Sequence, residues 1–165
     1  MRTKKPSSSG SRQTERPAMF KKFLVTKQDY TIAAIRLVFG AVFFAHGAQK
    51  ALGWFGGDGF NKTMGSFQQM DIPASLAALA IAAEFLGGLG LLTGFLTRLA
   101  ALGIITNMIV AILMVHSKVG FFMNWSGSQK GEGFEYHLLA IALGLTLLVK
   151  GAGAFSVDRL LAARS

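Results

Sequence analysis

The stretch that decides the fold is residues 75–96, SLAALAIAAEFLGGLGLLTGFL, in which Glu84 is the only charged side chain. Its 22 residues are enough to cross the hydrocarbon core of a bilayer as a single helix. An ionisable group at that depth is strongly destabilising unless it faces the protein interior and finds a partner. The sequence therefore predicts a membrane protein in which Glu84 points into a helix bundle.

The composition supports one small membrane domain. Hydrophobic residues make up 52% of the 165 residues, and the mean hydropathy is +0.45, which is more than one soluble core of this size requires. The chain has no cysteine, which excludes disulfides, a CxxC thiol relay and thiolate metal ligands. The formal net charge of +9 lies mostly in a basic stretch before the first apolar segment. We therefore expect the lipid bilayer, and not nucleic acid, as its partner.

Three further apolar segments predict spans at residues 32–52, 99–115 and 134–149, which makes four with residues 75–96. The last is the shortest, because only residues 136–149 are clearly apolar, a length that a buried or re-entrant segment also has. We keep it as a span because an odd number would place the basic C-terminus on the opposite side. The expected fold is an all-α, integral membrane four-helix bundle at residues 30–155. A basic disordered cytoplasmic tail at residues 1–29 precedes it, and a short basic cytoplasmic end at residues 156–165 follows.

The positions of lysine and arginine predict the orientation, because positively charged flanks stay cytoplasmic. Basic residues border the first span, the turn at residues 94–98 and the C-terminal end, whereas the loops at residues 53–74 and 116–133 are nearly balanced in charge. We therefore expect both termini in the cytoplasm. In the first external loop, Phe60, Met64 and Phe67 recur at helical spacing after a glycine-rich break, which predicts a short interfacial helix on the outer surface.

Polar residues on the neighbouring spans are candidates to share the interior with Glu84. Arg36 on the first span and Asn107 on the third lie in stripes of mostly small residues spaced three, four or seven apart. At about 1.5 Å per residue, Arg36 lies roughly 6–9 Å and Glu84 roughly 18 Å from the cytoplasmic end, and His46 lies roughly 6 Å beyond Glu84. A long guanidinium could reach the carboxylate, so Arg36 and His46 are the predicted partners of Glu84.

Two interpretations of this buried polar group, Arg36, His46, Glu84 and Asn107, stay open. One is a structural salt bridge or hydrogen bond that fixes helix register. The other is a protonatable site for a quinone or a proton path, because a buried carboxyl group can exchange protons near neutrality. In a third arrangement Arg36 reaches back to the cytoplasmic headgroups and leaves Glu84 to other partners.

A second polar cluster is expected at the outer face. His46 and Lys50 near the end of the first span, His116 at the end of the third, and Glu135, Tyr136 and His137 at the start of the fourth are predicted to converge there. Three histidines and a glutamate have the donor atoms for a metal, but their spacing matches no short metal-binding motif such as HExxH. We therefore expect interfacial polar residues and no metal site.

An ordered series of residues along the four spans resembles the DoxX family of small bacterial membrane proteins. The resemblance covers residues 30–149 and rests on Arg36, Gly40, His46, Gly47 and Lys50; Glu84, Gly87, Gly88, Leu91, Gly94 and Arg98; His116, Gly120, Phe121 and Phe122; and Glu135 and Tyr136. It implies a multi-pass protein of the bacterial inner membrane with four spans. The family name derives from a small subunit associated with quinone-linked respiratory oxidation, and most members have no demonstrated activity of their own.

Two functional classes are compatible with these observations. The first is a small subunit that accompanies a quinone-linked redox enzyme and is not catalytic alone, with quinone as its candidate cofactor. The second is a small membrane transporter or a stress and membrane-integrity protein without a redox role. Candidate protein partners are a redox enzyme subunit and further copies of the chain. The sequence carries neither a nucleotide-binding loop nor facing haem-ligand pairs, so electrons have no obvious route through the chain alone.

Overall fold

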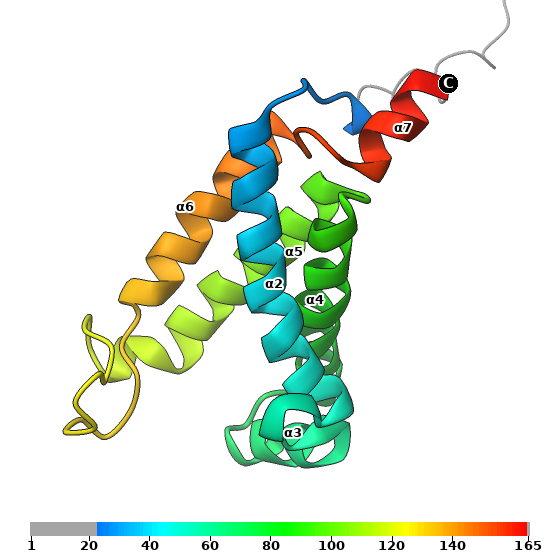
Figure 1. Ribbon diagram of the computed structural model, residues 1–165. Coiled ribbons are helices and arrows are strands. Elements are labelled where there is room, and N and C mark those ends of the chain that lie inside the picture. The colour runs from blue at the N-terminus through cyan, green and yellow to red at the C-terminus, as the bar shows by residue number, and fades with distance from the viewer. Residues whose placement is uncertain (1–22, 165) are drawn as a thin grey trace, which may run out of the picture.

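The computed structural model describes residues 23–164, and within this range the chain is helical without strands (Figure 1). The two shortest elements are single-turn 3-10 helices. In chain order the elements are α2 (Tyr30–Leu52), η1 (Trp54–Gly56), α3 (Gly59–Gln69), α4 (Ala74–Thr93), α5 (Thr97–Met114), η2 (His116–Lys118), α6 (Glu135–Lys150) and α7 (Val157–Arg164).

The predicted apolar segments form α2, α4, α5 and α6, with bounds within three residues of those expected. By length and composition, α2, α4 and α5 qualify as membrane spans among the described residues. At 16 residues α6 is about 24 Å long, shorter than the hydrocarbon thickness of about 30 Å. The expected helix in the first long loop is also present, as α3, which buries none of its side chains.

Glycines bring α2 and α4 into backbone contact. A Cβ on Gly47 would lie 2.4 Å from the Phe85 Cα, and one on Gly88 would lie 2.3 Å from the Phe44 backbone nitrogen. Neither position tolerates a side chain without separating the helices, which is how small residues promote helix packing in lipid. These contacts fix the height of α2 against α4 and hence the level at which their polar residues meet.

α5 and α6 form the second half of the bundle. α6 packs mainly on α5, and α5 also packs on α4. α6 lies close to α2 near the chain termini and diverges from it toward the opposite end (Figure 1). Buried apolar residues from all four helices, Ile32, Phe39, Phe43, Leu91, Ala101, Ile104, Met108, Ala140 and Leu147, form the core. We call the end that holds residues 23–29, the α4–α5 turn and α7 the terminal end, and the end that holds α3 and residues 115–134 the loop end.

The terminal end corrects the predicted domain boundaries. Of the tail, residues 1–22 lie outside the described residues, but Leu24 is only 2% exposed and therefore belongs to the core. The carbonyls of Phe23 and Val25 accept hydrogen bonds from Arg98. At the other terminus, α7 was expected to be a separate basic end, yet its residue Asp158 is buried against the α4–α5 turn. The packed domain therefore extends in both directions beyond residues 30–155.

Candidate functional site

Glu84 lies near the middle of α4 and is paired with Lys50 and Asn107. The Lys50 Nζ donates to both carboxylate oxygens, at 2.6 Å to Oε1 and 2.5 Å to Oε2, and the Asn107 Nδ2 donates to Oε1 at 2.9 Å. The Glu84 side chain is 6% exposed, whereas that of Lys50 is 33% exposed. The pair therefore joins a buried anion to a cation that still reaches the surface of the bundle.

Three helices position this triad. Gly47 of α2 packs on the backbone of Glu84 and Phe85, and Lys50 follows one turn later, in the last turn of α2. Its flexible four-carbon stem lets the ammonium reach back to the carboxylate. Asn107 extends from α5, which packs along the other side of α4. The site thus depends on the glycine contact between α2 and α4.

The predicted pairing of Glu84 with Arg36 is wrong. The Arg36 side chain is fully buried and donates only to backbone carbonyls. Its Nε donates to Ala152, its Nη1 to Leu91 and Leu92, and its Nη2 to Ala154 and Phe155. The physical reason is the end of α4, whose last carbonyls lack helical partners and carry partial negative charge. Arg36 satisfies these carbonyls, so its guanidinium turns toward the terminal end and away from Glu84.

The predicted role of His46 is also wrong. His46 is exposed on α2, and the carboxylate's hydrogen bonds within the described part of the chain come from Lys50 and Asn107. Helical geometry explains the difference: Lys50 is three residues from Gly47 and ten from Gly40, which places it on the face of α2 that packs on α4. His46 precedes Gly47 by one residue and points to another side.

Asp158 and Arg98 join the helix ends through contacts that the sequence did not predict. The Asp158 carboxylate accepts from the backbone nitrogens of Leu96 at 2.7 Å and Thr97 at 2.9 Å, so it caps the start of α5 from α7. The Arg98 Nε donates to the Leu148 carbonyl at 3.1 Å, near the end of α6. An acidic residue in a basic C-terminal segment was the available signal for Asp158.

The expected outer cluster divides into two parts. The rings of His116 and His137 lie 4.1 Å apart between centroids, and His116 Nδ1 contacts the Glu132 carbonyl at 2.7 Å. Glu135 does not join them, because its Oε1 accepts from the Met123 nitrogen and the Trp125 Nε1. Lys50 belongs to the Glu84 triad instead, although it is close enough to His137 to interact electrostatically. No group of three or more His, Asp or Glu residues within residues 23–164 is placed to hold a metal ion.

Two polar groups beside the triad have no hydrogen-bond partner. The His137 Nδ1 is buried and unpaired among the described residues. The Tyr136 hydroxyl forms no hydrogen bond there either, and Tyr136 is close enough to Glu84 for electrostatic interaction. Buried polar atoms in proteins are normally hydrogen-bonded, so the buried His137 Nδ1 is open to a ligand or a water molecule. Tyr136 is only half-buried, so water can also reach its side chain.

Comparison with known proteins identifies the family of this bundle. The sequence profile of the DoxX family matches residues 31–117. The chain belongs to the DoxX family. Inner membrane protein YqjF of Escherichia coli strain K12 is 31% identical over 134 residues, covering 81% of this chain and 94% of YqjF.

Two further relatives extend the DoxX comparison. A Bacillus subtilis protein named "Putative oxidoreductase CatD" is 29% identical over 113 residues, covering 68% of this chain and 75% of CatD. The "Uncharacterized membrane protein Rv3486" of Mycobacterium tuberculosis is 31% identical over 143 residues, covering 82% of this chain and 83% of that protein. No solved structure matches the chain. With its three apolar helices, this DoxX chain is a membrane protein.

The chemistry open to the DoxX triad follows from its unequal exposure. A carboxylate that is already paired with an ammonium and an amide is a weak site for a second cation. The Lys50 ammonium has three N–H donors, and its partly exposed side chain leaves room for another acceptor. Two surface pockets are described, and neither touches the triad; one lies in the loop after α5 and the other among residues 25–32, 98 and 149–153. A ligand would therefore meet the triad at the exposed side of Lys50.

Proposed function

We propose that this protein is a small inner-membrane subunit that accompanies a quinone-linked redox enzyme and has no catalytic activity alone. The polar contact for the quinone is the triad of Lys50, Glu84 and Asn107, with Tyr136 and His137 beside it. A quinone supplies a pair of carbonyl oxygens that accept hydrogen bonds and take up two electrons and two protons on reduction. The electrons come from the partner enzyme, because this chain has no cysteine for a thiol relay.

The observation that carries this proposal is the set of unused donors around one buried carboxylate. Lys50 is partly exposed, the His137 Nδ1 is unpaired, and the Tyr136 hydroxyl forms no hydrogen bond in the described chain. A buried ion pair that served packing alone would gain most from saturated hydrogen bonding. Here Lys50 is placed to donate to a carbonyl oxygen, and Glu84 is placed to hold the counter-charge. The Bacillus subtilis relative is named as an oxidoreductase, which adds support for a redox role.

The test is purification of the full-length protein from its native membrane in a mild detergent, followed by quinone extraction and identification of co-eluting proteins. The expected result is retained quinone together with a redox enzyme. Asn107→Leu and Lys50→Met should each reduce quinone retention by about tenfold or more, which corresponds to the loss of one hydrogen bond to a charged or buried group. The matched control is Thr106→Val, since the Thr106 hydroxyl is exposed and bonds only to its own helix.

Two outcomes would contradict the proposal. One is quinone retention that responds equally to Asn107→Leu and Thr106→Val, which would place the quinone elsewhere. The other is a preparation with neither quinone nor a redox partner, which would instead favour a transporter or membrane-integrity role.

We also propose four spans, with both termini in the cytoplasm and α3 on the outer membrane surface. Support comes from the charge asymmetry of the loops, from the packing of α6 along α5 with residues 23–29 and α7 at one end of the bundle (Figure 1), and from the absence of buried side chains in α3. Reporter fusions after Ser165 and within the loop at Gly127 should give opposite signals. Matching signals would remove α6 as a span.

A further inference from the structure

The loop between α5 and α6 is fixed by its own acidic residues. The Glu132 Oε2 accepts from the Asn124 backbone nitrogen at 2.7 Å, and the Glu135 Oε1 accepts from the Met123 nitrogen and the Trp125 Nε1 at 3.1 Å each. Backbone bonds from Phe134 to Gly120 and from Glu135 to Phe121 close the loop at its base. Both carboxylates therefore have internal partners.

The same loop leaves two lysines without partners. Lys118 and Lys130 form no hydrogen bond or ion pair with any residue in the range 23–164. The sequence suggested that Glu132 balances them, but its carboxylate is bonded to the Asn124 nitrogen instead. Hydrogen bonds from neutral N–H groups leave Glu132 and Glu135 negatively charged, so the loop stays nearly balanced overall, but its two ammonium groups have no ion-pair partner among the described residues and are free to bind an anion.

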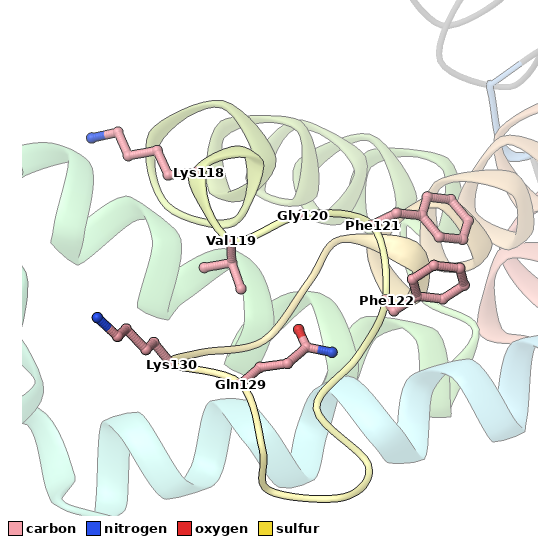
Figure 2. A pocket seen from close by; sticks show the side chains of 7 residues that line it. All are labelled: Lys118, Val119, Gly120, Phe121, Phe122, Gln129 and Lys130. Carbon is pink, nitrogen blue, oxygen red and sulfur yellow. The ribbon is translucent and has the colours of Figure 1, made fainter.

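These lysines line the larger of the two described pockets, which has a volume of about 540 Å³ (Figure 2). Its wall contains no carboxylate and consists of Lys118, Val119, Gly120, Phe121, Phe122, Gln129 and Lys130. In Figure 2 the two lysine side chains extend to one side of the pocket, and the rings of Phe121 and Phe122 lie at the other. The pocket is therefore cationic on one side and aromatic on the other.

The position of the pocket limits what can occupy it. It lies directly after α5, which ends at Met114, and before α6, which begins at Glu135. The ends of membrane helices lie at the level of the lipid headgroups. An anion that also carries an apolar part matches this combination of ammonium groups, phenyl rings and depth.

We propose that this pocket binds a phosphate group, with the Lys118 and Lys130 ammoniums on the phosphate oxygens and, where the phosphate belongs to a lipid, with Phe121 and Phe122 against its apolar chain. Lysine is a common phosphate ligand that acts as a point charge. The phosphate comes either from an anionic phospholipid headgroup or from free phosphate. The site is separate from the Glu84 triad and does not depend on the proposed redox role.

The experiment uses the full-length protein with two probes. Phosphatidylglycerol is titrated into phosphatidylcholine nanodiscs and its binding measured by native mass spectrometry, and inorganic phosphate is titrated into pure phosphatidylcholine nanodiscs in a calorimeter. The variants are Lys118→Gln with Lys130→Gln, and separately Phe122→Ala. The control is Lys62→Gln, which removes an exposed lysine from α3 at the same end of the bundle.

We expect the double lysine variant to bind the preferred probe about thirtyfold more weakly, or about fivefold for each lysine. Lys62→Gln should bind as the unaltered protein does. Phe122→Ala should weaken phosphatidylglycerol but not inorganic phosphate if the ligand is a lipid, and lysine dependence with inorganic phosphate alone would identify free phosphate as the source. Equal binding of both probes by the double lysine variant and by Lys62→Gln would overturn the site.

Discussion

Both ends of the bundle contain charged side chains that are at least partly removed from water, but the exposure and the hydrogen bonding of these side chains differ between the two ends. At the terminal end, Arg36 is fully buried and all its donor atoms are bonded to carbonyls, and Asp158 accepts from the start of α5. At the loop end, Lys50 is 33% exposed in its ion pair with Glu84, and the His137 Nδ1 is unpaired. One unpaired hydroxyl, Thr97 Oγ1, is the exception at the terminal end.

This difference separates a structural role from a binding role. A buried charge whose hydrogen bonds are complete has nothing left to offer a ligand and stabilises the arrangement of the helices. A charge with unused donors beside unpaired polar atoms is organised for a partner that the chain does not itself supply. On the function proposed above, the terminal end holds the helices together and the loop end binds the ligand.

The largest expected effect is at Arg36. Arg36→Met removes the side-chain donor of five backbone carbonyls in a buried or partly buried region, and we expect a loss of about 3–5 kcal/mol in the free energy of unfolding. Unfolding in mixed detergent and SDS micelles measures it. The control is Arg159→Met, which removes one exposed side-chain hydrogen bond to Gln28. A loss below 1 kcal/mol for Arg36→Met would mean that the buried contacts of the terminal end do not stabilise the fold more than those of the loop end.

The next effect is at the glycine contact that sets the height of the triad. Gly88→Ala places a Cβ 2.3 Å from the Phe44 nitrogen, and because backbone cannot yield as a side chain does, we expect a loss of about 2–3 kcal/mol. The control is Gly65→Ala on α3, where nothing lies within 4 Å and where alanine should stabilise the helix by up to about 1 kcal/mol. Equal effects at both positions in the same unfolding assay would exclude close α2–α4 packing.

The sequence was sufficient for the helices and insufficient for the partners of Glu84. Long apolar segments give residues 30–52 and 74–93 within a few residues, because bilayer thickness fixes helix length. Gly40 and Gly47, which share a face of α2 with Arg36, are the residues at which α2 packs on α4. Periodicity gives a face, but it does not give the relative height of two antiparallel helices.

That missing height is why Arg36 was assigned to Glu84. Counted from the expected cytoplasmic ends of the two helices, the depths of Arg36 and Glu84 allow a long guanidinium side chain to reach toward the carboxylate. The carbonyls at the end of α4 and in residues 152–155 are backbone groups, which leave no mark in a side-chain pattern. Only the folded chain shows that these carbonyls compete successfully for Arg36 and that Lys50 reaches the carboxylate.

A double-mutant cycle sharpens the comparison at an intermediate magnitude. Glu84→Gln combined with Lys50→Met should show a coupling free energy of about 1–2 kcal/mol, while Glu84→Gln combined with Arg36→Met should show nearly none. The expectation at Lys50 is modest because its side chain is partly exposed and can regain water. Unfolding of the four variants in each cycle gives both values. A larger coupling with Arg36 than with Lys50 would contradict the geometry of both ends.

The smallest effect is at Asp158. Comparing it with Asp58 tests whether Asp158 caps a helix or only lies near the start of one. Asp158→Ala removes the acceptor for the Leu96 and Thr97 nitrogens, and we expect a loss of about 1 kcal/mol, the typical cost of a lost N-terminal cap. Asp58 precedes α3 but accepts no capping hydrogen bond from it, so Asp58→Ala is the matched control and should change the unfolding free energy by less than about 0.5 kcal/mol.

Because the Asp158 carboxylate also attracts the Arg36 guanidinium, Asp158→Ala should cost less in an Arg36→Met background. Equal losses of stability in both backgrounds would mean that the Asp158 cap and the Arg36 contacts act independently, so that the two are not energetically coupled.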